Sequence, residues 1–432
     1  MMENNSLLIE NGILPYGFVM TKKNPVYLTV LLVALAMIIT FQLTIVLTES
    51  YKIADSTQSA VSDFSEQLIG KDTIDRLKEI ARQYAAYYPG EIDPELVERY
   101  LISALISGVG DDFGNYFYPE AFAERLQQLQ GNYKGIGVSV EDHSDEGYIK
   151  IVAVTEGSPA QEAGVIIGDL ITHVGEDKQS VSELGYTGAV SKIKGEEGTI
   201  AYFTVSREGV SIDFSVERKT IVNKTVSYKL IDGEVKSALI RITQFDGATA
   251  EQFAEALEKA KTDGVDGYVF DVRSNPGGEL TSVTKVLDML LGEGPIIRIE
   301  YKDESQNKQI DSDAVKLDAP MVVLCNGSTA SAGELFCAAL KDHGAATLVG
   351  VQTYGKGTMQ TYVRLSDGSG LALTVAYYLP PYSDNYHGIG VSPDTVCELP
   401  GDLLNTQIED IPADRDLQLQ TALGILVKTV NK

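Results

Sequence analysis

Residues 321–342 read MVVLCNGSTASAGELFCAALKD, and this segment is the most informative one about the fold. It begins with five apolar residues, which is typical of a buried strand, and it ends in a helical pattern over 334–342. A turn of small and polar residues separates the two. Strand-like and helix-like stretches alternate around it, at 238–261, 267–291 and 347–350. Such alternation predicts an α/β core, residues 220–400, with a largely parallel sheet.

Other parts of the chain show different patterns. Residues 131–219 are short β-rich runs between Gly and Pro turns, which predicts a small, mostly-β domain. Residues 48–130 are predicted to be helical, because 73–87 has apolar residues at helical spacing and Asp93-Pro94 is a typical helix start. The C-terminal segment 401–432 is predicted to contain an amphipathic helix, at 414–428. The whole chain is therefore expected to be an α+β multidomain protein.

The N-terminus contains a candidate membrane segment. Residues 26–47 have no charged side chain and are long enough, at about 1.5 Å per residue, to cross a hydrocarbon core of about 30 Å. Lys22 and Lys23 precede this stretch, so the positive-inside rule places residues 1–25 in the cytoplasm. A cleaved signal peptide is the alternative, but its apolar part is shorter and ends in small residues. We expect a single transmembrane helix in the cell membrane, with the folded domains outside the cytoplasm.

Charge and composition exclude several classes of protein. The chain has 35 Lys and Arg against 61 Asp and Glu, a net charge of −26, whereas nucleic-acid binding depends on clustered basic side chains. Three Cys residues do not provide a disulfide framework, and four His residues show no metal-ligand spacing. We therefore expect no nucleic-acid partner, no metal and no organic cofactor.

Ser331, in the turn of the opening stretch, has two interpretations. Ser331-x-x-Glu334 fits a capping box, in which Ser331 begins the helix and Glu334 bonds back to it. In the functional interpretation the same geometry presents the Ser331 hydroxyl as a nucleophile. The N–H of Ala332, at the positive end of the helix, then becomes an oxyanion donor. The two roles are compatible.

A serine hydroxyl needs a base, and no His stands in a convincing order with an Asp. The candidate is Lys356, which follows a strand and lies between two glycines. Its ammonium can act as a base near neutral pH only if burial lowers its pKa, and the alternative is a solvated turn lysine. A phosphate-binding loop is a further alternative, since Gly350 and Gly355-Lys356 match its spacing. The Ser or Thr and the helix that must follow in such a loop are missing.

Three turns of the core resemble those of the C-terminal processing (tail-specific) proteases, a Ser–Lys peptidase family with an inserted PDZ domain. The resemblance covers roughly residues 70–430. The turns are a nucleophile turn, Asn326-Gly327-Ser328-Thr329-Ala330-Ser331-Ala332-Gly333-Glu334, a base turn, Gly355-Lys356-Gly357-Thr358-Met359-Gln360, and a Gly turn, Asp271-Val272-Arg273-Ser274-Asn275-Pro276-Gly277-Gly278. The resemblance implies that Ser331 is the nucleophile, Lys356 the general base and Gln360 its orienter.

The Gly turn and two other segments add to this resemblance. In relatives the Gly turn lines the oxyanion site, so Gly277 or Gly278 is expected to donate beside Ala332. Residues 110–116 and 388–394 are similar to further short elements of the family.

The mostly-β part, residues 131–219, resembles a PDZ domain. Gly135-Ile136-Gly137-Val138 is similar to the carboxylate-binding loop, whose backbone N–H groups hold a chain-terminal carboxylate while the peptide adds as a strand. Residues 158–169 are similar to a second PDZ motif. Lys194 stands where many relatives carry Arg, at a position expected to couple the PDZ domain to the catalytic core.

Together these features predict a membrane-anchored serine endopeptidase that cleaves extracytoplasmic proteins and recognises their C-terminal tails. The alternative is a non-catalytic PDZ sensor or scaffold on a degenerate protease fold, although such a protein would more often have lost Ser331 or Lys356. The helices at 70–107 and 414–428 resemble the parts through which relatives dimerise, so a homodimer is expected.

Overall fold

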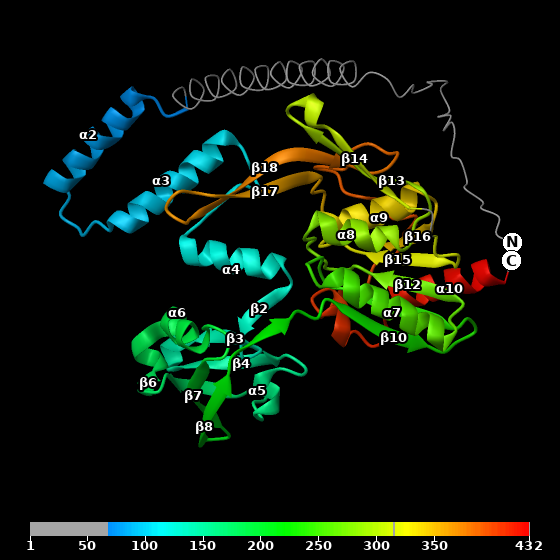
Figure 1. Cartoon of the computed structure of the whole chain (residues 1–432), viewed down its shortest axis with the longest axis horizontal. Coiled ribbons are helices and arrows are strands. Elements are labelled where there is room, and N and C mark those ends of the chain that lie inside the picture. The colour runs from blue at the N-terminus through cyan, green and yellow to red at the C-terminus, as the bar shows by residue number, and fades with distance from the viewer. Residues whose placement is uncertain (1–67, 314–315, 432) are drawn as a thin grey trace, which may run out of the picture. The chain divides into compact units, whose positions relative to one another are not determined.

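The computed structural model describes residues 68–313 and 316–431 (Figure 1). The chain divides into two units, one ending at Val97 and one beginning at Glu98, and each is described by itself. The described part of the first unit contains α2 (Lys71–Tyr87) and the start of α3 (Pro94–Val109). Both helices lie where the sequence predicts them. Asp93 caps α3, because its carboxylate accepts from two N–H groups of the first turn, at 2.9 and 3.2 Å.

The predicted membrane-spanning segment, residues 26–47, lies outside the described residues. Within the described ranges, no helix combines the length and the apolar character needed to cross a membrane.

The second unit contains a six-stranded sheet in the order β10–β11–β12–β15–β16–β19. All neighbours are parallel except β10 and β11, which confirms the predicted largely parallel sheet. The strands are β10 (Val226–Ile231), β11 (Ser237–Ile242), β12 (Gly267–Asp271), β15 (Met321–Cys325), β16 (Ala346–Gly350) and β19 (Thr395–Val396). Because parallel strands end at the same edge of a sheet, the turns after β12, β15 and β16 meet there.

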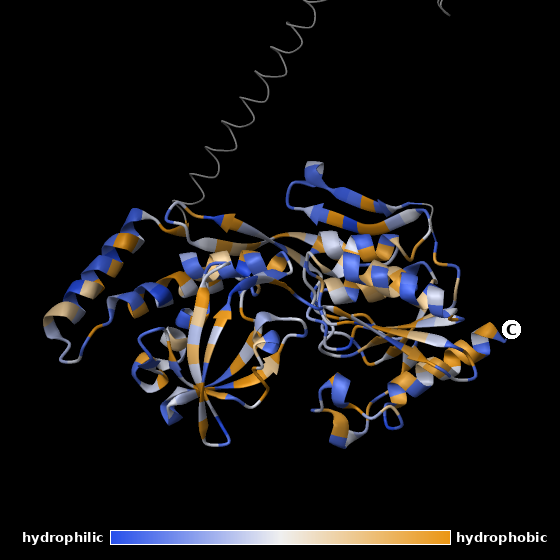
Figure 2. Cartoon of the chain, turned by 60° about the horizontal axis from the view of Figure 1, so that its bottom comes forward, coloured by the Kyte–Doolittle hydropathy of each residue, from blue (hydrophilic) through white to orange (hydrophobic). Residues whose placement is uncertain are grey.

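Helices cover both faces of this sheet. On one face lie α7 (Thr249–Asp263), α8 (Leu280–Asp288) and α9 (Ala332–Asp342), and on the other lies α10 (Leu417–Val430). Successive strand residues alternate between the two faces: Phe270 packs in the first cluster and Val269 in the cluster of α10. Much of α10 is coloured hydrophobic in Figure 2. Burial on both faces accounts for the continuous apolar runs of β12 and β15.

A second, five-stranded sheet is antiparallel throughout. Its order is β1–β18–β13–β14, with β17 paired to β18. The strands are β1 (Asn115–Phe117), β13 (Gly294–Tyr301), β14 (Lys308–Ser312), β17 (Thr358–Arg364) and β18 (Gly370–Leu379). The hairpin of β17 and β18 follows Lys356 directly and therefore begins beside the edge where the turns after β12, β15 and β16 meet.

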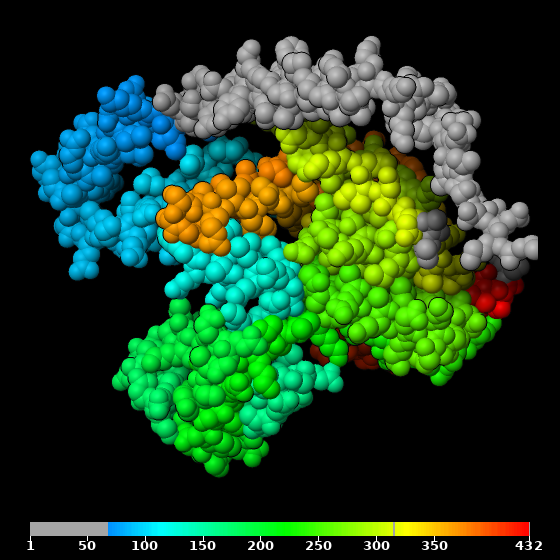
Figure 3. All heavy atoms as spheres, in the orientation of Figure 1, coloured from blue at the N-terminus to red at the C-terminus, as the bar shows by residue number. Residues whose placement is uncertain are grey.

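Residues 138–217 form a mostly-β lobe, the PDZ-like module, with a core of its own (Figure 3). Its sheet has the order β3–β4–β5–β7–β8, with β6 beside β5. The elements are β3 (Val138–His143), β4 (Tyr148–Val154), α5 (Pro159–Glu162), β5 (Leu170–Val174), β6 (Gln179–Ser180), α6 (Val181–Ile193), β7 (Ile200–Arg207) and β8 (Val210–Glu217). The prediction of a small β domain inserted before the core is confirmed.

Two short strands connect the PDZ-like module to the core. β2 (Asn132–Gly135) follows α4 (Pro119–Leu129) and pairs antiparallel with β9 (Lys219–Val222), which leads into β10. The N–H of Asn223 donates to the carbonyl of Gly131 at 2.9 Å, so the two connections are held together. Short 3₁₀ turns complete the described chain, at η1 (Ser144–Glu146), η2 (Glu304–Gln306), η3 (Gly401–Leu403) and η4 (Ile408–Asp410).

Candidate active site

Ser331 stands between β15 and α9, in the nucleophile turn. Its backbone has φ 54° and ψ −119°, a left-handed conformation that is strained for a residue with a side chain. Two hydrogen bonds to the Gly turn and its strand hold this conformation. Thr329 Oγ1 donates to the carbonyl of Val272 at 2.8 Å, and the N–H of Ala330 donates to the carbonyl of Asn275 at 2.9 Å. The segment that follows β12 therefore keeps the Ser331 backbone in this strained conformation.

The Glu334 carboxylate joins the nucleophile turn to the base turn. It is fully buried, and its Oε2 accepts from the N–H of Ser331 at 2.9 Å and from the N–H of Lys356 at 2.7 Å. Its Oε1 accepts from Thr353 Oγ1 and from the N–H of Gly355, both at 2.6 Å. The predicted capping box is present, and the same carboxylate also fixes the backbone of the base turn.

Lys356 is partly buried, and its amine lies over the ring of Phe113, 4.4 Å from the ring centroid. Burial and the guanidinium of Arg125 lower the pKa of Lys356, and they outweigh the carboxylates of Asp111 and Glu334, which raise it. Among the described residues, no hydrogen bond joins Lys356 Nζ to Ser331 Oγ. The structure thus brings the two turns together, with the amine turned toward Phe113.

Gln360 lies on β17, beside a bulge in its pairing with β18. Its Nε2 donates to Thr358 Oγ1 at 3.0 Å and to Thr374 Oγ1 at 3.1 Å. Thr374 Oγ1 donates in turn to Asp111 Oδ1 at 2.8 Å. In this structure Gln360 is therefore tied to the segment 110–116, which the resemblance singled out, and not to Lys356.

The Gly turn lies directly against Ser331. A Cβ added to Gly277 would stand 2.7 Å from Ser331 Cβ and 2.9 Å from the nitrogen of Ala332, so only glycine fits there. The N–H of Gly277 is occupied, because it donates to Asn275 Oδ1 at 2.8 Å. The N–H groups of Gly278 and Ala332 have no hydrogen-bond partner within the described part of the chain. Of the two glycines, Gly278 is the one with an available donor.

A buried charge cluster fixes the strand end that leads into the Gly turn. Arg273 is 2% exposed, and its guanidinium donates to both oxygens of Asp271, at 2.9 and 2.7 Å, and to both oxygens of Asp416, at 3.0 and 2.9 Å. Asp416 also caps α10, since it accepts from the N–H of Leu419 at 3.0 Å. The start of α10 is thereby attached to the end of β12, next to the Gly turn.

Two buried tyrosines stand beside Ser331, and no motif in the sequence indicates them. Tyr378 Oη lies 3.1 Å from Ser331 Oγ and 2.8 Å from the carbonyl oxygen of Lys356. Tyr386 Oη lies 3.4 Å from the carbonyl oxygen of Ser331. Burial raises the pKa of both phenols above their usual value. Both tyrosines are far from Ser331 along the chain, so only the folded sheet brings them to the site.

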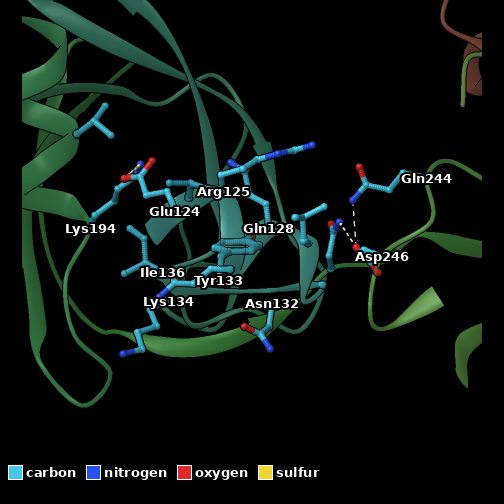
Figure 4. Close-up of a pocket in the computed structure, with 18 of the residues that line it drawn as sticks. Glu124, Arg125, Gln128, Asn132, Tyr133, Lys134, Ile136, Lys194, Gln244 and Asp246 are labelled. Carbon is cyan, nitrogen blue, oxygen red and sulfur yellow. Dashed lines mark hydrogen bonds and ion pairs between the residues drawn. The ribbon is translucent and has the colours of Figure 1, made fainter. Parts of the chain in front are cut away.

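A groove of about 710 Å³ extends from the PDZ-like module to the Gly turn. Residues 135–138 line one end, residues 276–278 line the other, and α4 lines the stretch between them. Lys194 forms an ion pair at 2.7 Å with Glu124 of α4, and both side chains are about half exposed (Figure 4). Lys194 therefore connects the PDZ-like module to the helix that precedes it.

The loop Gly135-Ile136-Gly137-Val138 has the backbone that a carboxylate site needs. Gly137 has φ 87°, and a Cβ there would stand 2.2 Å from Ser158 Cβ. The N–H groups of Ile136 and Gly137 find no hydrogen-bond partner among the residues described. Ile136, Val190 and Ile193 provide apolar walls beside them. Two convergent donors next to apolar walls suit a chain terminus with an apolar last residue.

Two family models match the chain. Peptidase family S41 matches residues 236–397, and the PDZ domain model matches residues 135–217. The chain is 33% identical over 334 residues to the carboxy-terminal processing protease CtpA of Bacillus subtilis, covering 77% of this chain and 70% of that protein. It is 33% identical over 316 residues to the carboxy-terminal-processing protease of Bartonella bacilliformis, covering 71% of each. It is 32% identical over 330 residues to the carboxyl-terminal-processing protease of a Synechocystis species, covering 75% of this chain and 76% of that protein.

Proposed function

We propose a Ser–Lys mechanism for this chain, which belongs to peptidase family S41 and to its carboxy-terminal processing proteases. Lys356, as the neutral amine, accepts the proton of Ser331 while Ser331 Oγ attacks a peptide carbonyl carbon. The N–H groups of Ala332 and Gly278 donate to the carbonyl oxygen as it becomes negative. The Lys356 ammonium then gives its proton to the leaving amine, and water repeats the sequence to release the acyl product.

The observation that carries this proposal is the Glu334 clamp, in which one carboxylate oxygen binds the N–H of Ser331 and the N–H of Lys356. It holds the nucleophile turn and the base turn at a fixed distance. For the reaction, the amine of Lys356 leaves the ring of Phe113 and turns to Ser331 Oγ. Gln360 orients the amine there, as the family resemblance implies.

The groove supports a proposal for substrate recognition. The PDZ domain holds the C-terminal carboxylate of a polypeptide at the N–H groups of Ile136 and Gly137, with the last side chain against Val190 and Ile193. The chain then follows the groove toward Gly278, where it meets the oxyanion donors. The substrate class is therefore unfolded polypeptide with an exposed, apolar C-terminal tail.

Location and assembly are part of the same proposal. Residues 26–47 anchor the protein in the cell membrane, and the catalytic domain acts on the extracytoplasmic side. The homodimer contact lies on the helices of 70–107, where large apolar side chains are exposed, among them Ile80 at 54% and Tyr84 at 58%. Light scattering of the full-length chain in detergent is expected to give twice the protomer mass after correction for the micelle.

The test is proteolysis by the full-length chain in detergent. We expect the wild type to cut an unfolded protein with an apolar C-terminus, with fragments identified by mass spectrometry. Ser331→Ala and Lys356→Ala are each expected to abolish cleavage, whereas Lys285→Ala, an exposed lysine of α8, retains it. Persistent cleavage by Ser331→Ala would contradict the assigned nucleophile.

A non-catalytic PDZ scaffold is the second candidate, and the position of the Lys356 amine over Phe113 is the observation that favours it. This scaffold binds tail peptides with the same carboxylate loop but cuts none of them. Peptide binding without any cleavage, in the presence of tail peptides as well as in their absence, would select it over the peptidase.

A further inference from the structure

Tyr378 contacts Ser331 Oγ and has no part in the mechanism above. It lies on β18, is 5% exposed, and places its Oη 3.1 Å from Ser331 Oγ. Among the described residues it is the only side-chain group hydrogen-bonded to that oxygen. The phenol is thus in contact with the atom that forms the new bond.

We propose that Tyr378 is a catalytic residue, whose phenol donates a hydrogen bond to Ser331 Oγ while that oxygen carries negative charge. The inference rests on the proposed function, because it requires Ser331 to be the nucleophile. It adds a donor on the attacking oxygen, in addition to the two N–H donors assigned to the carbonyl oxygen.

The geometry explains why this bond would be stronger in the transition state than at rest. The phenol has one proton and two acceptors, Ser331 Oγ at 3.1 Å and the carbonyl oxygen of Lys356 at 2.8 Å. At rest both acceptors are neutral and compete for the proton. Once Ser331 loses its proton, Oγ becomes the stronger acceptor, and charge-assisted hydrogen bonds are about twice as strong as neutral ones. An interaction that strengthens only in the transition state accelerates the reaction.

The protons balance without any release from Tyr378. In acylation the Ser331 O–H bond breaks, Oγ bonds to the carbonyl carbon, and the proton passes through the Lys356 amine to the leaving amine as the peptide C–N bond breaks. In deacylation Lys356 takes a proton from water, the water oxygen bonds to the acyl carbon, and the Oγ–carbon bond breaks while Oγ recovers that proton from the Lys356 ammonium. Burial keeps the Tyr378 phenol protonated throughout, because it raises the pKa of that group above its usual value.

Tyr386 provides a matched control. It is as buried as Tyr378, at 5% exposure, and its ring lies 6.0 Å from the Tyr378 ring. Its Oη faces the backbone carbonyl of Ser331 and not the reacting oxygen. Tyr386→Phe therefore removes a comparable phenol oxygen, one that contacts the Tyr378 phenol and the Ser331 carbonyl but leaves the donor on Ser331 Oγ in place.

The experiment compares full-length wild type, Tyr378→Phe and Tyr386→Phe in detergent. Two readouts are used: kcat and KM for a fluorogenic peptide ending in an apolar residue, and the rate at which a fluorophosphonate labels Ser331. We expect Tyr378→Phe to lower kcat and the labelling rate by about 10- to 100-fold, with KM within about twofold. Tyr386→Phe stays within about threefold of the wild type.

The pH profile separates this role from a structural one. Loss of the phenol donor lowers the plateau of kcat/KM and leaves the acid limb in place, because the limb reports the Lys356 amine. A displaced base turn would move the limb as well. Equal rates for Tyr378→Phe and Tyr386→Phe, or a moved limb in Tyr378→Phe, would overturn the inference.

A second variant covers the case in which Tyr378→Phe fails to fold. Replacing Tyr378 alone with 3-fluorotyrosine keeps the ring and both hydrogen bonds but makes the phenol a stronger donor. We expect faster labelling of Ser331 than in the wild type, and an unchanged or slower rate would contradict the proposal. A wild type that neither cleaves peptide nor is labelled at Ser331 would instead contradict the proposed function and, with it, this inference.

Discussion

The carboxylate of Glu334 sets both the geometry and the charge environment of Lys356. It accepts from the N–H of Lys356 at 2.7 Å. Its negative charge raises the pKa of the Lys356 amine, but burial and Arg125 lower that pKa by more. Glu334→Gln removes the charge and one acceptor. We expect a further fall in the pKa of Lys356. Because the neutral amine is the proposed base, we expect the acid limb of kcat/KM to move to lower pH and the plateau to fall by about tenfold.

Thr353→Val is the control for this prediction. It removes one donor from the same carboxylate and leaves the charge in place, so the acid limb is expected to stay where it is in the wild type. A limb that does not move in Glu334→Gln would show that the carboxylate does not act on the amine.

Gly277 tests how closely the Gly turn approaches the nucleophile. Gly277→Ala combines a backbone at φ 101° with a Cβ only 2.7 Å from Ser331 Cβ. We expect fluorophosphonate labelling of Ser331 to fall by more than tenfold and the free energy of unfolding to fall by about 2–4 kcal/mol. Gly368→Ala has a similar φ of 91°, but its nearest neighbour would be 3.8 Å away. It is expected to lose only about 1 kcal/mol and to keep its labelling rate, and equal labelling losses in the two variants would count against the contact.

At the scale of elements, local sequence patterns predict those strands and helix ends that depend on residues close together in the chain. β12 and β15 are buried on both faces, so their apolar runs are continuous and easy to recognise. The capping box of α9 is also local, because Ser331 and Glu334 are three residues apart. The start of α10 was less well predicted. The predicted helix begins at residue 414, whereas α10 begins at Leu417, after a cap by Asp416.

The parts of the site that sequence patterns did not indicate depend on contacts between distant segments. Asp416 is paired with Arg273, and Tyr378 with Ser331, only because sheet and helices bring them together. Neither pair has a spacing that a local pattern can show. The family resemblance indicated Gly277 and Gly278 equally, and only the hydrogen bond from Gly277 to Asn275 distinguishes them.

The attachment of α10 gives a prediction on stability. Asp416→Asn retains a side chain that can cap the helix but removes one of the two carboxylates paired with buried Arg273. Breaking a buried pair leaves a partly uncompensated charge, so we expect the free energy of unfolding to fall by about 3 kcal/mol. Asp402→Asn breaks the exposed pair with Arg415 and is expected to cost less than about 1 kcal/mol. Urea unfolding measures both, and equal midpoints would contradict the role given to the buried cluster.

At the scale of the whole molecule, the connections of the PDZ domain meet the Gly turn at one short segment, residues 245–246. Buried Asp246 accepts from Asn223, at the exit of the domain, at 2.9 Å. The preceding residue is Phe245. Its N–H donates to the carbonyl of Gly277 at 2.8 Å, and its carbonyl accepts from the N–H of Glu279 at 2.7 Å. We therefore expect a displacement of the PDZ domain to reach the Gly turn through these few hydrogen bonds, and a variant that breaks one of them can measure the coupling.

Asp246→Ala removes this link and leaves the carboxylate loop, residues 135–138, intact. We expect a fluorescent tail peptide to bind the full-length variant within about twofold of the wild-type affinity, because the peptide contacts lie inside the domain. The ratio of peptidase rates with and without that peptide is expected to move toward one. This holds whether the peptide activates or inhibits the wild type. Asp213→Ala breaks an exposed pair with Lys178 within the PDZ domain and leaves Asp246 in place, so it serves as control and is expected to keep the wild-type ratio. An unchanged ratio in Asp246→Ala would mean that the tail signal reaches the active site by another route, such as the Lys194–Glu124 pair on the groove.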